Sequence, residues 1–465
     1  MPFDNISLGL SLAEIVSTRR ISCLPTGRRS VLHTWNWACF CLAIAALLST
    51  APAMADDVLN PQAMARISGK YQATGALPQG VGVLDRARPE YDALGVPVGS
   101  FLLYPTFVTS VSNDDNIFRT PGGTVSDSFW TFSPRLDLRS QWSQDFLQLY
   151  GQADGYQYDS HNTESRTNWV GGGATEVSLA PGTVVDAKAS YFGTHESRGS
   201  PDISSAALSP TAYSLFHTDV SILNQPGPLG LSAGVSYDRH VYDPTALIGG
   251  GQVDNADRNS RIVETFGKVS YELQPGDSIF ARASYNTRDF DLQFDRNGFQ
   301  HSSDGYRLDG GLQMLFSPLI KGTVYLGYLQ QNFKAPLHSV SGFDFGSQID
   351  WYATELMTFH LTTSRILTDT TIAGASNEDQ RSVQGSVDYE LLRNLILQAS
   401  VGYENDNFKG AGRTDHLTTF GLGAEYFLDK RVGFYARYDH SGRDSTVGGG
   451  DFADNLLSAG ITLQY

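Results

Sequence analysis

Cysteine is scarce in this chain, and its three copies all lie near the N-terminus. They are Cys23, Cys39 and Cys41, and all precede residue 56, where we expect the mature chain to begin. The mature protein would therefore contain no disulfide, no cysteine-ligated metal and no thiol nucleophile. A chain without cysteines also suits passage through an oxidising compartment in unfolded form.

Long apolar runs are missing as well. The run Ala38–Leu48 spans about eleven residues, which is too short for a helix that crosses a bilayer. It follows four arginines (Arg19, Arg20, Arg28 and Arg29) and precedes the small-x-small site Ala53-Met54-Ala55. This order predicts a signal peptide over residues 1–55 that is cleaved near Ala55.

Positive charge is in deficit. The chain has 33 Lys and Arg against 49 Asp and Glu, a formal net charge of −16. This balance argues against a nucleic-acid partner and against adhesion to anionic lipid headgroups. A solvated acidic surface is the plain alternative reading of the same balance.

Glycine and aromatic residues are abundant, with 47 Gly, 22 Tyr and 25 Phe. From Gly99 onward the chain alternates between apolar and polar residues in segments of about ten to fifteen residues. In one segment Leu229, Leu231 and Val235 share a face, and Ser232 and Ser236 share the other. The pattern predicts β-strands with one apolar and one wet face.

The connections between these segments alternate between short and long. Compact turns are expected at residues 180–183, 274–277, 317–320, 391–394 and 428–431, and polar loops at 113–126, 159–167, 195–211, 243–260, 290–304, 334–343, 369–380, 406–414 and 440–452. This rhythm predicts an all-β fold, a transmembrane antiparallel β-barrel of about eighteen strands over residues 99–465. Sixteen strands are the alternative, because residues 343–366 are hard to divide. Residues 56–98, which include four prolines, are predicted to form a periplasmic N-terminal extension.

The last strand alternates to its final residue. Its apolar face consists of Leu457, Ala459, Ile461, Leu463 and Tyr465. This ending is similar to the C-terminal signal of bacterial outer-membrane barrels, whose last residue is typically Phe, Trp or Tyr. The similarity implies insertion into outer-membrane lipid by the barrel-insertion machinery of a Gram-negative bacterium.

Charged residues occur at many positions on the wet face, and we expect them to line the barrel lumen, because a charge facing lipid is costly. The expected lumen residues are Arg135, Asp137, Arg139, Lys188, Glu264, Lys268, Arg282, Arg288, Arg307, Asp309, Asp388, Glu390, Glu404, Glu425, Arg437 and Asp439. Both signs are present, so mutual pairing could hold much of this set as a structural network. The sharper hypothesis is that unpaired arginines and inward aromatics guide a sugar chain.

Candidate catalytic and metal motifs are weak. Gly230–Gly234 matches the G-x-S-x-G hydrolase elbow but lies in an alternating segment, whereas the elbow requires a strand-to-helix turn. The acidic clusters at residues 113–116 and 254–257 offer oxygen ligands for calcium without the spacing of a full calcium loop. We therefore predict no catalytic residues, no resident metal, no cofactor and no enzymatic activity, and leave open whether the external loops bind calcium.

Three short sequence motifs near the start of the predicted barrel resemble those of a known family. They are Arg88–Asp92, the stretch Gly99–Pro105, and Asn113–Phe118. They resemble the opening of a family of outer-membrane β-barrel porins whose members are often associated with exopolysaccharide or capsule gene clusters. The resemblance covers residues 85–465 and implies an outer-membrane barrel, with a polysaccharide and periplasmic export components as partners. It supplies no catalytic residues.

Three functions are compatible with these observations. The leading hypothesis is a passive conduit that assists exopolysaccharide export across the outer membrane. The alternatives are a general or small-solute diffusion porin and a non-transporting barrel that anchors an envelope complex. A long loop folded into the barrel would favour selective transport over a general pore. A lumen closed by salt bridges would favour the anchor.

Overall fold

The computed structural model describes residues 80–317 and 319–465. The predicted signal peptide and residues 56–79 of the predicted extension lie outside this part of the chain. The described residues form one large antiparallel sheet with two short 3₁₀ helices, η1 (Asn162–Glu164) and η2 (Ala256–Arg258). None of the described helices is long and apolar enough to cross a membrane.

The large sheet contains eighteen long strands. They are β2 (Phe101–Asp114), β3 (Asp127–Ser140), β4 (Phe146–Tyr158), β5 (Arg166–Ala180), β6 (Thr183–His195), β7 (Ala212–Asn224), β8 (Leu229–Tyr242), β11 (Ser260–Gln274), β12 (Asp277–Phe290), β13 (Ser303–Ser317), β14 (Ile320–Phe333), β15 (Val340–Thr354), β16 (Met357–Thr368), β17 (Glu378–Leu392), β18 (Leu395–Phe408), β19 (Arg413–Phe427), β20 (Val432–Ser445) and β21 (Phe452–Gln464). A short strand β1 (Val96–Val98) pairs with the start of β2, and β9 (Thr245–Ala246) with β10 (Gln252–Val253) forms a separate hairpin.

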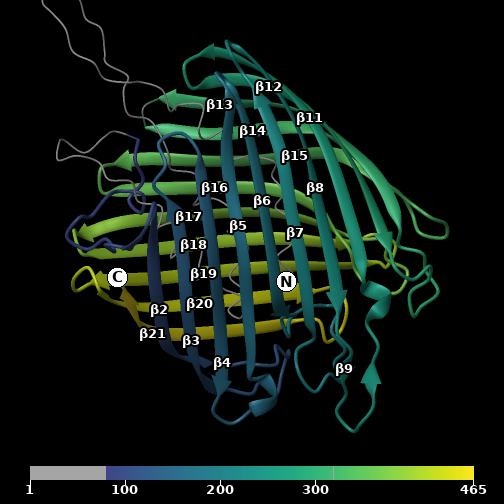
Figure 1. Ribbon diagram of the computed structural model, residues 1–465. Helices are drawn as coiled ribbons and strands as arrows, with labels where there is room; N and C mark the ends of the chain where they lie inside the picture. The colour runs from purple at the N-terminus through teal and green to yellow at the C-terminus, as the bar shows by residue number, and fades with distance from the viewer. Residues whose placement is uncertain (1–79, 318) are drawn as a thin grey trace, which may run out of the picture.

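Each long strand pairs with its neighbour in the chain, and the sheet closes because β2 also pairs with β21 from Thr106↔Gln464 to Asp114↔Leu456. The prediction of an eighteen-stranded antiparallel barrel is therefore confirmed. The ambiguous stretch 343–366 divides into β15 and β16, which meet at a turn over residues 355–356. In Figure 1 the front strands cross those behind steeply, as expected when all strands tilt about a barrel axis.

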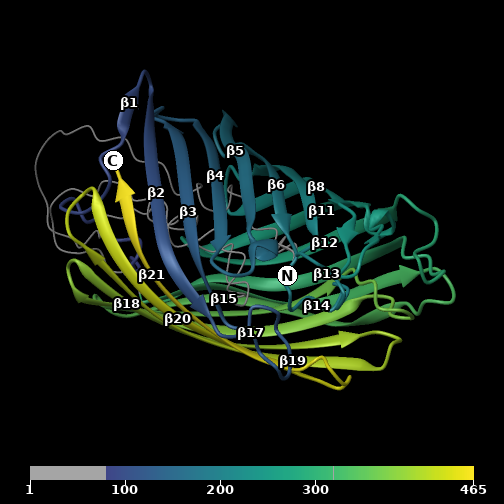
Figure 2. The same cartoon turned by 90° about the horizontal axis from the view of Figure 1, so that it is seen from below.

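The two ends of the barrel differ. Connections such as residues 181–182, 275–276, 355–356 and 393–394 are short and lie at one end, which we call the short-turn end. Residues 196–211, 243–259 and 291–302 form longer connections at the other end, the long-loop end. The C-terminus lies at the short-turn end, on the side opposite the β9 hairpin (Figures 1 and 2). Short and long connections thus alternate as the sequence predicts.

The two faces of the sheet carry opposite chemistry. Leu229, Leu231 and Val235 on β8 are exposed, whereas Asp238 and His240 on its other face are buried. The same holds at β21, where all five apolar residues of the predicted insertion signal are exposed. In a closed barrel the buried polar face is the interior, so the exposed apolar side chains form an outer belt that suits lipid.

Candidate functional site

The connection between β6 and β7, residues 196–211, folds toward the barrel interior, and we call it the inward loop. Its base is closed by a hydrogen bond from the backbone N–H of Glu196 to the carbonyl of Thr211 (2.8 Å). Two internal turns follow, with Ser200 N–H donating to the Ser197 carbonyl and Ala207 N–H to the Ser204 carbonyl. The loop is therefore a folded element with its own backbone hydrogen bonds.

Asp202 of the inward loop reaches the opposite side of the barrel. Its Oδ1 accepts hydrogen bonds from the hydroxyls of Thr370 (2.8 Å) and Thr371 (3.0 Å) and from the backbone N–H of Thr371 (2.8 Å). The two threonines belong to the connection between β16 and β17, which in the ring lies eight strands from the inward loop in one direction and ten in the other. The inward loop therefore crosses the barrel at the long-loop end.

Two buried arginines hold the first residues of the inward loop. Arg119, in the connection after β2, donates to Ser197 Oγ (2.5 Å) and pairs with Asp454 (3.3 Å). Arg443 on β20 donates to the carbonyl of Gly199. Arg119 has a positive φ of 52°, a conformation that is costly for a residue with a Cβ. The contacts of Arg119 with Ser197 and Asp454 thus hold this residue in its strained backbone conformation, and through Arg119 they hold the loop.

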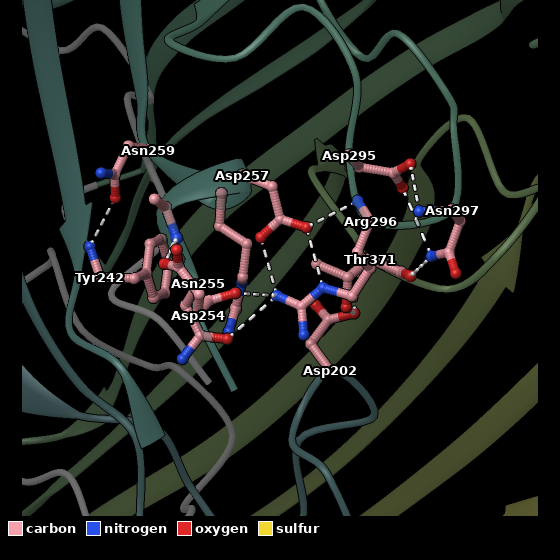
Figure 3. Close-up of polar contacts among 12 residues, drawn as sticks. Asp202, Tyr242, Asp254, Asn255, Asp257, Asn259, Asp295, Arg296, Asn297 and Thr371 are labelled. Carbon is pink, nitrogen blue, oxygen red and sulfur yellow. Dashed lines mark hydrogen bonds and ion pairs between the residues drawn. The ribbon is translucent and has the colours of Figure 1, made fainter. Parts of the chain in front are cut away.

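A second network joins the neighbouring connections to the loop base, and Figure 3 shows the part of it around Arg296. Arg296 forms a two-pronged pair with Asp257 (2.7 and 2.8 Å) and also donates to Asn255 Oδ1 (3.1 Å). Hydrogen bonds from Arg296 hold the pKa of Asp257 below its usual range, against the effect of burial. Arg258 pairs with Glu196 of the inward loop. The acidic cluster at residues 254–257 is therefore engaged with arginine, not arranged as an open calcium site.

Two adjoining cavities lie beneath these contacts and share Ile262, Arg288, Ile366 and Leu367 as lining residues. Arg288 on β12 separates them. It donates to Asp369 Oδ1 (2.8 Å) and to the carbonyl of Leu367 (2.8 Å), which belong to β16 and the connection after it. Arg288 therefore links β12 to the end of β16 where the two cavities adjoin.

None of the sixteen predicted lumen residues is exposed, and their strands turn them away from the outer apolar belt. Many form ion pairs: Arg135 and Arg139 with Asp137, Arg282 with Glu264, Arg288 with Asp369, Arg307 with Asp344, Asp388 with His360, Glu390 with Arg86 and Arg88, and Arg437 with Asp439. Glu404 instead contacts a second acid, Asp406. Lys268 lies 4.4 Å from the centre of the Phe280 ring, while Lys188, Asp309 and Glu425 complete the set. Their role as pore-lining residues remains a proposal.

The segment over residues 80–95 covers part of the short-turn end, and we call it the N-terminal strap. Val83 is fully buried, packs with Ile396 and Phe427, and donates its N–H to Thr358 Oγ1 (3.0 Å). Arg88 donates to its own strap at the carbonyl of Val83 (2.7 Å) and pairs with Glu390 on β17 (2.9 Å). The sequence predicted that these residues belong to a periplasmic N-terminal extension, and it did not predict their contacts with the barrel. The one available signal was the cluster of two arginines and an apolar pair at residues 83–88.

Strap docking is expected to strengthen as pH falls. Burial and the nearby Asp350 raise the pKa of Asp85 above its ordinary value of 3.8, and Asp388 adds to the effect, while His360 and Lys321 oppose it. A raised pKa means that the docked strap binds a proton more tightly than the free strap. The gain in docking free energy is therefore complete below the ordinary pKa of Asp85, and it is lost as pH rises through the raised pKa of Asp85 in the docked strap. Trypsin cleavage within the strap should slow at acidic pH relative to cleavage of an added reference peptide. Asp85→Asn should remove that relative dependence, and an unchanged profile in this variant would contradict the assignment.

The structure also places the remaining sequence motifs, the G-x-S-x-G match and the first acidic cluster. Ser232 of the G-x-S-x-G match lies within β8, without the turn that a hydrolase elbow needs. In the first acidic cluster, Asp114 and Asp115 have carboxylate oxygens within 4.8 Å of one another and of Asp454. Asp454 is already paired with Arg119, so the cluster is tied to the anchoring of the inward loop.

A closed eighteen-stranded barrel with an apolar outer belt and a charged interior defines an outer-membrane β-barrel of the porin type. The chain belongs to the family described as "Putative beta-barrel porin 2", whose model matches residues 88–465. The resemblance carried by the opening phrases of the barrel is thereby confirmed.

Several solved structures are similar to this chain. OpdK from Pseudomonas aeruginosa is 13% identical, with a TM-score of 0.40, over 78% of this chain and 99% of that one. OccAB4 from Acinetobacter baumannii is 11% identical, with a TM-score of 0.41, over 78% and 98% of the two chains. OpdQ from P. aeruginosa is 12% identical, with a TM-score of 0.41, over 81% and 100%. Among curated proteins, no match was found.

Proposed function

We propose that this protein is an outer-membrane channel that passes small polar solutes selectively. The observation that carries the proposal is the inward loop, whose Asp202 bonds to Thr370 and Thr371 across the barrel. A loop that crosses the lumen reduces its open cross-section and brings polar groups close to any passing solute.

We further propose an orientation for the channel. In outer-membrane barrels the short turns face the periplasm and the long loops face outward. The N-terminal strap would then lie at the periplasmic mouth and the inward loop near the external mouth. A solute would meet the inward loop, the charged interior and the strap in that order.

Exopolysaccharide export remains a second candidate, because the family resemblance suggests it. A polymer strand would require both the inward loop and the N-terminal strap to move aside for the whole time of its passage. A small solute would need only local side-chain movement. The contacts at the two mouths therefore favour the small-solute channel.

The first test is electrical. Purified protein inserted into planar lipid bilayers should produce discrete conductance steps in KCl, and liposomes that contain it should swell in small polar solutes but not in long oligosaccharides. Bilayers with verified insertion but no conductance would exclude a channel and favour the anchor. Loss of cell-free polysaccharide in a deletion strain, restored by complementation, would support export instead.

A further inference from the structure

The interior face of strands β17–β20 carries an excess of acidic side chains. We call this set the acidic wall: Asp388, Glu404, Asp406, Asp415, Glu425 and Asp439. All except Glu425 are buried. The basic residues of the same face are Arg413, Arg437 and Arg443, so the wall bears a net negative charge.

Local pairing leaves part of this charge in place. Arg437 pairs with Asp439 (2.6 Å), and Arg413 pairs with Asp415 (2.6 Å), which Arg443 approaches to 3.8 Å. Asp388 pairs with His360 (3.0 Å). These contacts pair Asp388, Asp415 and Asp439 with cations, of which His360 belongs to the neighbouring strand β16.

Glu404 and Asp406 are arranged differently. They lie two residues apart on β18, on the same interior face, and their side chains contact each other. The charge of Arg443 acts on Asp406 from a longer distance. Both side chains are more than nine-tenths buried, yet Glu404 Oε1 and Asp406 Oδ1 have no hydrogen-bond partner among the described residues. Buried carboxylate oxygens without a donor are costly, and a bound cation would satisfy them.

The basic residues on the opposite side of the interior do not offset this excess. On β12 and β13, Arg282 pairs with Glu264 (3.0 Å), Arg288 with Asp369 (2.8 Å) and Arg307 with Asp344 (3.5 Å). Each of these three arginines is therefore matched by a carboxylate in its own neighbourhood, and none of them pairs with the acidic wall.

We infer that the channel selects cations over anions, and that Glu404 and Asp406 bind the cationic group of the solute, an ammonium or guanidinium. Fixed carboxylates in a confined aqueous space raise the local concentration of cations and exclude anions. The inference rests on the proposed channel function and names the class of solute that the channel takes.

The test is the reversal potential of the purified full mature protein in a planar bilayer with a KCl gradient. The expected result is a reversal potential on the potassium side, which corresponds to a higher permeability for potassium than for chloride. The double substitution Glu404→Gln and Asp406→Asn should reduce this permeability ratio several-fold. The matched control, Asp444→Asn with Glu355→Gln, removes two exposed acids and should leave the ratio near the wild-type value.

Arginine amide added to one side of the wild-type channel should interrupt the current, and glutarate should not. This second measurement decides the question even if the double variant fails to fold. A conducting but anion-preferring or unselective channel would overturn the inference alone. An unchanged ratio in a folded double variant would overturn the assignment of the pair. Absence of any conductance would overturn the proposed function, and the inference with it.

Discussion

Shortening the inward loop is expected to raise the single-channel conductance several-fold. Replacing residues 199–208 with a short Gly-Ser linker removes Asp202 and the Gly199 carbonyl that Arg443 holds. The strands on either side keep their full ladders, so the barrel should stay closed. The measurement is the conductance step in KCl, compared with that of the wild-type protein.

The control for this deletion is a loop change away from the crossing. Gly227 lies in the connection between β7 and β8 at the short-turn end, is exposed, and would meet nothing within 4 Å of an added Cβ. Gly227→Ser should leave the conductance step unchanged. Asp202→Ala alone should give a noisier channel with an intermediate step, because the loop loses its far contact and keeps its base. Wild-type conductance after the full deletion would show that the loop does not limit flow.

Glu390→Ala is expected to release the N-terminal strap from the barrel. Glu390 pairs with Arg86 (3.4 Å) and Arg88 (2.9 Å), and all three side chains are about 5% exposed. Removing one partner of a buried ion pair typically costs about 3–5 kcal/mol, because the remaining charges stay buried without a counter-ion. Arg393, which also approaches Glu390 at 3.5 Å, adds to the uncompensated positive charge.

The measurement for this variant is limited trypsin digestion, since cleavage after Arg86 requires the strap to leave its site, whereas Arg88 precedes Pro89 and is not cut by trypsin. Cleavage should become rapid in Glu390→Ala, while the heat-dependent gel shift of the barrel stays as in the wild type. Glu355→Ala, an exposed acid at the same end, serves as the control and should resist cleavage. Equal resistance in both variants would mean that the packing of Val83 and the backbone hydrogen bonds of the strap hold it without the Glu390 ion pairs.

The strands could be predicted from the sequence because their signal is local. Alternation such as Leu229 to Tyr237 needs only a few residues to be visible, and turns such as Gln274–Asp277 carry their own residue types. The ring closure followed from the count of such segments and from an ending that alternates through Tyr465. The division of β15 from β16 escaped prediction because Thr354–Met357 contains neither Gly nor Pro.

The site could not be predicted in the same way. Asp202 meets Thr370 across 168 positions of the chain, and no periodic pattern links the two. The strap has the same difficulty, since Arg88 meets Glu390 across 302 positions. The lumen charges were placed by strand alternation, but which of them pair depends on strand register and on loops that fold inward. Glu404 and Asp406 therefore looked like any other acids of the wet face.

The seam between β2 and β21 orders the assembly of the molecule. Its two strands are the first and last of the barrel, so the ring cannot close before β21 has been made and inserted. The strap bonds to that final strand, through Gly95 N–H to the Tyr465 carbonyl and Gln464 Nε2 to the Tyr91 carbonyl. The N-terminal end of the described chain can thus complete its contacts only after the C-terminal end has. Until β21 is in place the strap lacks these two contacts, whereas its contacts with β16, β17 and β18 do not depend on the seam.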